Sequence, residues 1–508
     1  MCAYKRNTIV YFIDRPYLSG SMNDQTVRHS PNTPSIAGLA AVAAVALVLA
    51  ACAPAPRISS PSTPLPPHFE AGAPPVTPTT AAKLDDWWIA FGDSQLTRLI
   101  DRSLLASTTS RLAFARLQEA RATRTVTRAG TLPSGSLTGS VTEQGTRRAW
   151  GGGATTPGQE SYALNFYPSW EIDLFGRLGA IREQADTVSA ASTFDFQAVR
   201  LALAADVANA LFQARGLALD LETAIETRDI TEQLARAARI GEQRGISSGQ
   251  DLARLEADAA SAAAEATRLT GELQAAKRSL LILVGDPDAA TATLDIAPDL
   301  AMPPDLPPVT PGILLARRPD VLSAQLSLQS AILGARIDRL ALFPSFTIQP
   351  GLGLTGTGGP ATAGIGIWSI AAGIGLPILD RTRLMAQYRL SQARGEEAVV
   401  TYEKAVQTAF GEAENALVRL DAAKARMPAL ERANARSGAA FASATRGYRA
   451  GLTDLTTLIQ TQRTWLQARA ARNNGRLALL TGTVAAVRAL GGGWSPTRPN
   501  ASTADGTR

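Results

Sequence analysis

The chain has very few residues of the kinds that most enzymes use for chemistry. Its 508 residues include two cysteines, Cys2 and Cys52, and two histidines, His29 and His68. Metal sites and cysteine or histidine nucleophiles need several such residues close together. The composition therefore disfavours a zinc site, a cysteine–histidine enzyme and a disulfide-stapled scaffold, and we expect no metal ligands and no catalytic residues.

Clustered basic residues and phosphate-binding loops are also missing. The net charge is +6, but the arginines alternate with acidic residues and do not gather with aromatic ones. We therefore expect no nucleic-acid partner. Gly151, Gly152 and Gly153 lie in a polar loop and do not link a strand to a helix. No Gly-x-Ser-x-Gly turn stands beside a plausible base, so we expect no cofactor and no enzymatic activity.

The N-terminus resembles an export signal. The apolar run Ile36–Ala51 has 16 residues, which is shorter than the roughly 20 that span a bilayer. It ends at Leu49-Ala50-Ala51 before Cys52, the pattern at which bacterial lipoproteins are cleaved and acylated. We predict a signal peptide at 1–51, with Met22 as its possible true start, and a lipid on Cys52 that anchors the chain in outer-membrane lipid.

A proline-rich segment follows the predicted lipid site. Nine of the 28 residues from Ala53 to Thr80 are proline. Such segments stay extended and do not pack. We therefore predict that 52–83 is a tether, and that a tail at 495–508 is disordered.

The rest of the chain contains one unit twice. Shifting the sequence by 206 residues superposes 177–285 on 383–491 without a gap, and it keeps Gly245 in register with Gly451. Upstream, Leu132-Pro133-Ser134 corresponds to Phe343-Pro344-Ser345. We read this as an internal duplication, with a first copy at 84–300 and a second at 301–494.

Each copy contains a long helical hairpin. The stretch from Arg177 to about Arg244 is rich in good helix formers and free of proline, and at 1.5 Å per residue it would run roughly 100 Å. Gly245 and Gly451 can end the two long helices in the left-handed conformation. The serines that follow Gly245 can cap the first returning helix, and Thr453 can cap the second.

Segments of alternating polarity lie between each Pro-Ser break and the long helix. Strands of about ten residues with one apolar and one polar face are typical of outer-membrane barrels, although a half-buried sheet in a soluble protein has the same pattern. The mainly apolar phase of the alternation in the four candidate strands consists of Leu137, Gly139 and Val141; Tyr162, Leu164, Phe166, Pro168, Trp170 and Ile172; Phe346, Ile348, Leu352 and Leu354; and Trp368, Ile370, Ala372, Ile374 and Leu376. Since single-chain barrels need at least eight strands, about twice what one chain offers, several chains must share one barrel.

Together these features resemble the outer-membrane factor family of TolC-like channels, and in particular its lipoprotein branch, which serves efflux pumps of the resistance–nodulation–division class. Four motifs carry the resemblance, which runs from about Leu84 to Trp494: Asp86–Asp93, Trp170–Arg177, Leu314–Val321 and Ala489–Trp494. The resemblance implies a mixed, mainly α fold. It implies a homotrimer in which each chain gives four strands to one β-barrel, continued by a long periplasmic α-helical barrel.

The resemblance also implies the function and its sites. The protein would be a passive conduit that exports small compounds, taking them from an inner-membrane efflux pump through a periplasmic adaptor. The adaptor would dock on the helix tips, for which the candidates are Arg244, Gly245, Ile246, Ser247, Gly451, Leu452 and Thr453. The candidates for the gate of the aperture are Tyr448, Arg449, Asp454 and Gln460.

The sequence departs from the family pattern near the second tip. Gln460 stands where the family often has an aspartate of the closed aperture, and Pro428 falls inside the second long helix, where we expect a kink. Two alternatives share the lipid anchor and the hairpins. One is a channel for type I protein secretion, and the other is a periplasmic coiled-coil scaffold or adaptor, which the alternating strands disfavour.

Overall fold

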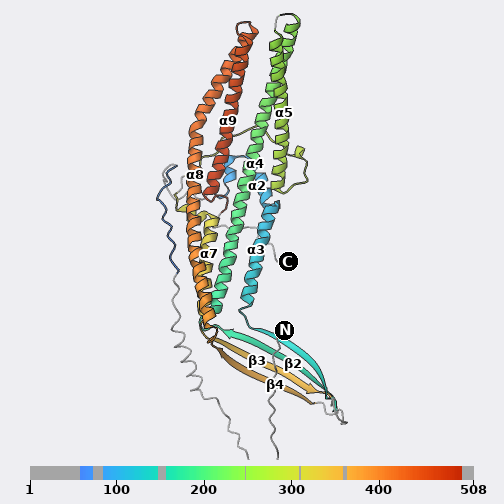
Figure 1. The fold of residues 1–508 in the computed structure, drawn as a ribbon, viewed down its shortest axis with the longest axis vertical. Helices are drawn as coiled ribbons and strands as arrows, with labels where there is room; N and C mark the ends of the chain where they lie inside the picture. The colour runs from blue at the N-terminus through green and yellow to red at the C-terminus, as the bar shows by residue number, and fades with distance from the viewer. Residues whose placement is uncertain are drawn as a thin grey trace, which may run out of the picture. The chain divides into compact units, whose positions relative to one another are not determined.

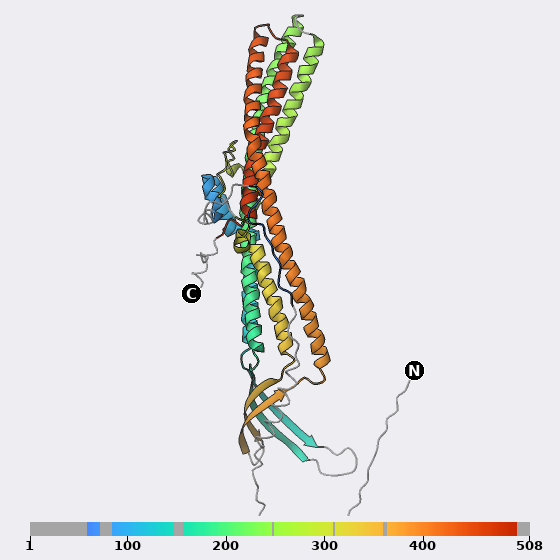
Figure 2. The same cartoon turned by 90° about the vertical axis from the view of Figure 1, so that its left-hand side faces the viewer.

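The computed structural model describes residues 58–71, 84–146, 156–245, 248–307, 310–358 and 363–494. Within these ranges the chain forms long helices that continue at one end into a four-stranded antiparallel sheet (Figures 1 and 2). None of the helices in the described ranges combines the length and the apolar character needed to cross a bilayer.

Two helical hairpins dominate the fold. Helix α4 (Arg177–Gln243) has 67 residues and returns as α5 (Gly249–Val284). Helix α8 (Arg381–Arg449) has 69 residues and returns as α9 (Leu455–Ala489), and it continues through Pro428 without a break. Figure 1 shows α8, α9, α4 and α5 side by side in that order, so that α5 and α8 lie on the flanks.

Shorter helices pair with the parts of α4 and α8 that lie toward the sheet (Figure 1). The predicted helix Ser94–Ala129 is two helices, α2 (Ser94–Ala106) and α3 (Thr108–Ala129), because Ser107 interrupts the first and caps the second. In the second copy, α6 (Ile313–Arg317) and α7 (Pro319–Leu340) take the corresponding places. Helices α3 and α7 begin and end 211 residues apart, which is the offset of the Pro-Ser breaks.

The sheet has the order β1-β2-β3-β4, formed by β1 (Ser134–Thr146), β2 (Thr156–Ile172), β3 (Ser345–Thr357) and β4 (Ala363–Gly375). All four predicted strands are therefore present. Leu137 pairs with Phe166, Phe166 with Leu352, and Leu352 with Trp368. Because side chains alternate between faces, this register puts the apolar stripes of all four strands on one face.

The opposite face of the sheet is polar except at one place. Ser136, Tyr167 and Gly351 share that face through the same register, whereas Ile365 and Ile367 of β4 also fall on it. Strands β1 and β4 form the two edges of the sheet, and their outer backbone groups pair with no described strand of this chain.

The proline-rich segment corrects a prediction. Residues 58–71 are extended, as expected, but they pack along α8. Ser59 N donates to Glu396 Oε1 (2.8 Å), Ser62 N to Glu403 Oε1 (2.6 Å) and Ala71 N to Glu414 Oε1 (3.0 Å). Proline leaves the backbone extended but does not prevent the remaining amides from finding carboxylates on a neighbouring helix.

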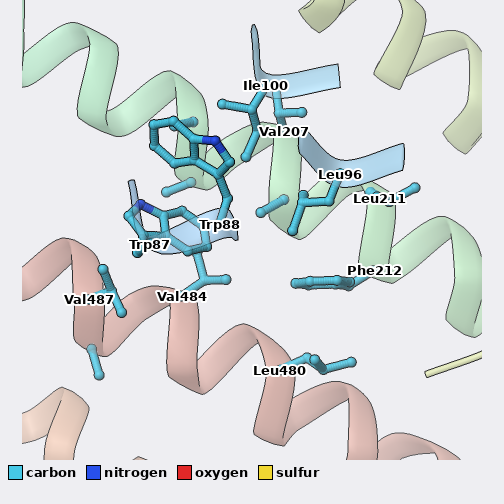
Figure 3. Packing of buried hydrophobic residues seen from close by; sticks show 14 of the residues in the cluster. Trp87, Trp88, Leu96, Ile100, Val207, Leu211, Phe212, Leu480, Val484 and Val487 are labelled. Atoms are coloured by element: carbon cyan, nitrogen blue, oxygen red, sulfur yellow. The ribbon is translucent and has the colours of Figure 1, made fainter. Parts of the chain in front are cut away.

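The main core lies where the two copies meet near the middle of the long helices. Trp87 and Trp88 belong to the short helix η2 (Trp87–Phe91) and are buried. Figure 3 shows them between α4 and α9, beside Val207 and Val484. Burying a large apolar side chain stabilises the fold by roughly 1.5–3 kcal/mol, so the segment before α2 fixes the two hairpins to each other.

Candidate functional site

The first helix tip is a tight, exposed turn. Gly245 follows α4 with φ of +69°, a conformation that glycine adopts without strain. Ser248 then caps α5, because its Oγ accepts a hydrogen bond from Asp251 N (3.1 Å). Arg244 is exposed beside the turn. The other two candidates, Ile246 and Ser247, lie outside the described residues.

The second tip has the same geometry with a different cap. Gly451 has φ of +74°, and Leu452 N donates to Gly447 O (2.8 Å), which closes the turn after α8. Leu452 is 84% exposed. The predicted cap Thr453 is wrong, because α9 begins one residue later and Asp454 accepts from Thr457 N (2.6 Å).

The four gate candidates lie at or close to the second tip. Asp454 uses its carboxylate on its own helix, and the backbone hydrogen bond from Thr457 lowers the pKa of Asp454. Arg449 and Gln460 are exposed, and Tyr448 is 36% exposed. In the described part of the chain none of these side chains forms an ion pair. Their assignment to a gate stays a prediction.

Between the tips and the main core, ion pairs link the two hairpins. Arg463 of α9 lies 3.0 Å from Asp258 of α5, and Arg469 lies 2.6 Å from Glu226 of α4. The side chain of Arg469 also lies over the ring of Trp465, which stacks on Phe441 of α8. Helices from both copies are thus held side by side from the core to the region of the tips.

Two of the motifs that suggested the family, Leu314–Val321 and Ala489–Trp494, meet beside Asp85 at a single junction. Arg317 forms an ion pair with Asp85 and donates to Trp494 O (2.9 Å). Trp494 Nε1 donates back to Arg317 O (2.9 Å). Gly491 packs against the same backbone, since a Cβ there would lie 2.6 Å from Arg317 O. The glycines near the C-terminus therefore permit a close approach of two chain segments.

Arg318 links three helices, the start of α7, the middle of α8 and the end of α9. It donates to Asp320 Oδ2 (2.6 Å), Glu412 Oε2 (2.7 Å) and Ala489 O (3.3 Å), which belong to α7, α8 and α9. Its burial disfavours the charged form, but the hydrogen bonds to Asp320 and Glu412 outweigh that effect and raise the pKa of Arg318. The motif was identified by its residues alone, and only the fold shows that it locks α7 end to end with α9.

In the first copy a similar ion-paired connection between helices was not predicted. Asp93 caps α2 and forms an ion pair with Arg215 of α4. Burial raises the pKa of Asp93, but the Arg215 guanidinium and the amides of Leu96 and Gln95 more than offset it, so the pKa is lowered. An acidic residue before a helix start was the available signal, but the position of Arg215 depends on the tertiary fold.

The remaining predicted site lies outside the described residues. Cys52 precedes residue 58, where the description of the chain begins. The lipid on Cys52 therefore stays a prediction.

Comparison with known proteins identifies the family. The family model described as outer membrane efflux protein matches residues 99–286 and 310–492, one stretch in each copy. The chain is 30% identical over 424 residues to the pyoverdine export outer membrane protein OpmQ of Pseudomonas aeruginosa, covering 82% of this chain and 89% of that protein. It is 28% identical to SilC of Salmonella typhimurium, a probable outer membrane lipoprotein, covering 88% and 96%.

Solved structures agree with this relationship. The chain is similar to the open state of the Neisseria gonorrhoeae MtrE outer membrane channel, with a TM-score of 0.76 and 26% identity over 87% of this chain and 99% of that one. The channel OprN matches with a TM-score of 0.71 and 28% identity. The chain belongs to the outer membrane efflux protein family.

Proposed function

We propose that this protein is the outer-membrane channel of a tripartite efflux system, a passive conduit for small compounds. The observation that carries the proposal is the sheet, in which the strand register gathers the apolar side chains on one face and leaves both edges open. An apolar outer face and a polar inner face suit a barrel wall in lipid.

Closure of that wall requires more than one copy. Four strands cannot close on themselves, and unpaired edges are costly in a bilayer. We propose a homotrimer in which β4 of one chain pairs with β1 of the next. The long hairpins then form a tunnel that extends into the periplasm toward an adaptor and an inner-membrane pump. The names of the relatives OpmQ, ArpC and CusC refer to pyoverdine, antibiotics and cations, so the class of cargo stays broad.

The strand phase gives a direct test of the barrel. Asn165 lies on the polar face and Leu164 on the apolar face of β2. A single cysteine at Asn165 should react with a water-soluble thiol reagent in intact outer membranes, and a cysteine at Leu164 should not. The opposite result would reject the barrel and with it the channel.

The lipid anchor is a separate proposal. Cys52 follows the signal-like run and would carry the acyl chains. Replacing Cys52→Ser should abolish metabolic labelling with radioactive palmitate. Continued labelling would show that the anchor is elsewhere or absent, and it would leave the channel itself untouched.

The tips are proposed to dock the adaptor. They are the turns farthest from the sheet in Figure 1, and Leu452 is exposed there without a covering group. Nothing lies within 4 Å of a Cβ built on Gly451, so a bulky residue would project outward and obstruct a partner. We expect Gly451→Trp and Gly245→Trp to abolish pump-dependent export while trimers still assemble in the outer membrane.

A matched control separates docking from folding. Gly312, just before α6, is also exposed, with nothing within 4 Å of an added Cβ. Gly312→Trp should export normally. Normal export by the tip variants would show that the tips do not dock a partner. For the gate, Arg449→Ala or Asp454→Ala should raise single-channel conductance, and unchanged conductance would remove both residues from the gate.

A further inference from the structure

The two hairpins have nearly the same backbone but opposite charge. Helices α4 and α5 together contain 15 acidic and 11 basic residues. Helices α8 and α9 contain 7 acidic and 17 basic residues, and α9 has no acidic residue at all. At the 206-residue offset, Arg426 stands opposite Asp220 and Arg432 opposite Glu226. The copies have therefore acquired opposite charge at equivalent places.

The ion pairs between the copies follow one polarity. Arg317 pairs with Asp85, Arg336 with Glu183, Arg463 with Asp258, Arg469 with Glu226 and Arg488 with Asp206. In each of these five pairs the cation comes from the second copy and the anion from the first. The seam inside the chain thus joins a basic hairpin to an acidic one.

Helix α8 presents further arginines on its free flank. Arg432, Arg436 and Arg446 are exposed, and in the described residues none of them forms an ion pair. Met427 and Ala444 mark the buried side of α8. At about 100° per residue, the three arginines lie roughly half a turn away from that side. They therefore point away from their own chain.

We propose that these arginines form the contact between neighbouring chains, by pairing with the acidic first hairpin of the next chain. This rests on the proposed shared barrel. A sheet that begins with first-copy strands and ends with second-copy strands closes head to tail, so that a second-copy flank meets a first-copy flank. The same order already holds inside the chain, where α9 meets α4. The contact between neighbouring chains, here called the ring seam, thus repeats the contact between the two hairpins of one chain. In both contacts the second copy provides the basic side and the first copy the acidic side.

The acidic side of the ring seam is helix α5. Asp251, Glu265 and Glu272 lie along it, whereas the equivalent positions of α9 are Thr457, Ala471 and Ala478. Asp258 of the same helix already pairs with Arg463 of its own chain. Glu265 and Glu272 are exposed and share only Arg268 within the chain. They are available to arginines of another copy.

The test reverses charge and measures trimer lifetime. We expect the double variant Arg432→Glu with Arg436→Glu to dissociate about tenfold or more faster than the wild type in detergent at low salt, as followed by native gel or mass spectrometry. The difference should shrink at high salt, where exposed charges are screened. Adding Glu265→Lys and Glu272→Lys in the same chain should restore the lifetime.

A matched control carries the same charge change on the first hairpin. Arg236→Glu with Arg254→Glu makes that hairpin more acidic and should leave the lifetime unchanged. Equal destabilisation by the control, a failed rescue, or wild-type lifetime for the Arg432/Arg436 variant would each overturn the proposal. Intact trimers that lose export would assign the arginines to another partner and would also overturn it. A wild-type chain that forms no trimer would instead reject the proposed function.

Discussion

The two copies end their return helices in the same way and then use that geometry differently. Gly285 and Gly491 have φ of +85° and +74°. A Cβ on Gly285 would lie 2.7 Å from the carbonyl carbon of Ala106, and one on Gly491 would lie 2.8 Å from that of Arg317. Ala106 and Arg317 are themselves related by the 211-residue offset. The duplication therefore preserved a close backbone contact.

The side chains at that contact differ. In the first copy Ser107 caps α3 by accepting from Thr109 N (3.3 Å). In the second copy Arg318 occupies the equivalent place, caps nothing with its side chain, and links three helices. One backbone frame thus supports a local cap in one copy and a long-range connection in the other.

The largest effect should come from breaking the shared backbone contact. We expect Gly491→Ala to destabilise the fold by about 2–4 kcal/mol, because alanine is strained in the left-handed region and its Cβ would press on the Arg317 carbonyl. Gly285→Ala should cost a similar amount. Thermal denaturation followed by circular dichroism in detergent measures both. A tolerated Gly285→Ala would show that the two contacts are not equivalent.

The second largest effect should differ between the two copies. Arg318→Ala removes hydrogen bonds to two carboxylates and a carbonyl at the end of α9, and we expect the free energy of unfolding to fall by about 2–3 kcal/mol. This is less than for a fully buried pair, because Asp320 and Glu412 are about half exposed. Ser107→Ala removes only a cap and should cost about 1 kcal/mol. Equal melting temperatures for the two variants would contradict the difference drawn above.

Local patterns in the sequence were sufficient to predict most of the fold. Helix-forming composition placed α4 and α8, glycines marked both reversals, and alternation placed all four strands. These signals work because each depends on neighbours within the same element. The break at Ser107 was missed, since a single serine within a helix-forming stretch looks like any exposed position.

Features that depend on contacts between distant segments were not predicted. The packing of 58–71 depends on Glu396, Glu403 and Glu414, which lie more than 300 positions later. The role of Arg318 likewise requires the end of α9. The tip residues could be found because a hairpin reversal is local, but whether they bind a partner cannot be read from one chain.

Acidification should weaken the ion pair between Asp93 and Arg215 in the first copy. The pKa of Asp93 is lowered in the folded state, so its carboxylate stabilises the fold above its ordinary pKa of 3.8 and loses that contribution as pH falls through the lower folded value. We expect Asp93→Asn to cost about 1–2 kcal/mol near neutral pH. The difference in the free energy of unfolding between Asp93→Asn and the wild type should become smaller on acidification below pH 3.8. A difference that does not change with pH would mean that the charge of Asp93 contributes nothing.

The smallest effect should come from the glycines at the tips, where the copies differ least. An added Cβ on Gly245 or Gly451 meets nothing within 4 Å, so alanine there adds only backbone strain, about 1 kcal/mol. Because each tip is exposed and far from the core, the strain should promote local opening and leave the global melting temperature unchanged. Amides around the turn should exchange with solvent about fivefold faster. We expect the same factor in both copies, measured by hydrogen exchange with mass spectrometry. A much larger change at Gly451 than at Gly245 would show that the second tip is held by contacts beyond its own turn, such as those of Tyr448 or Arg449 with another chain.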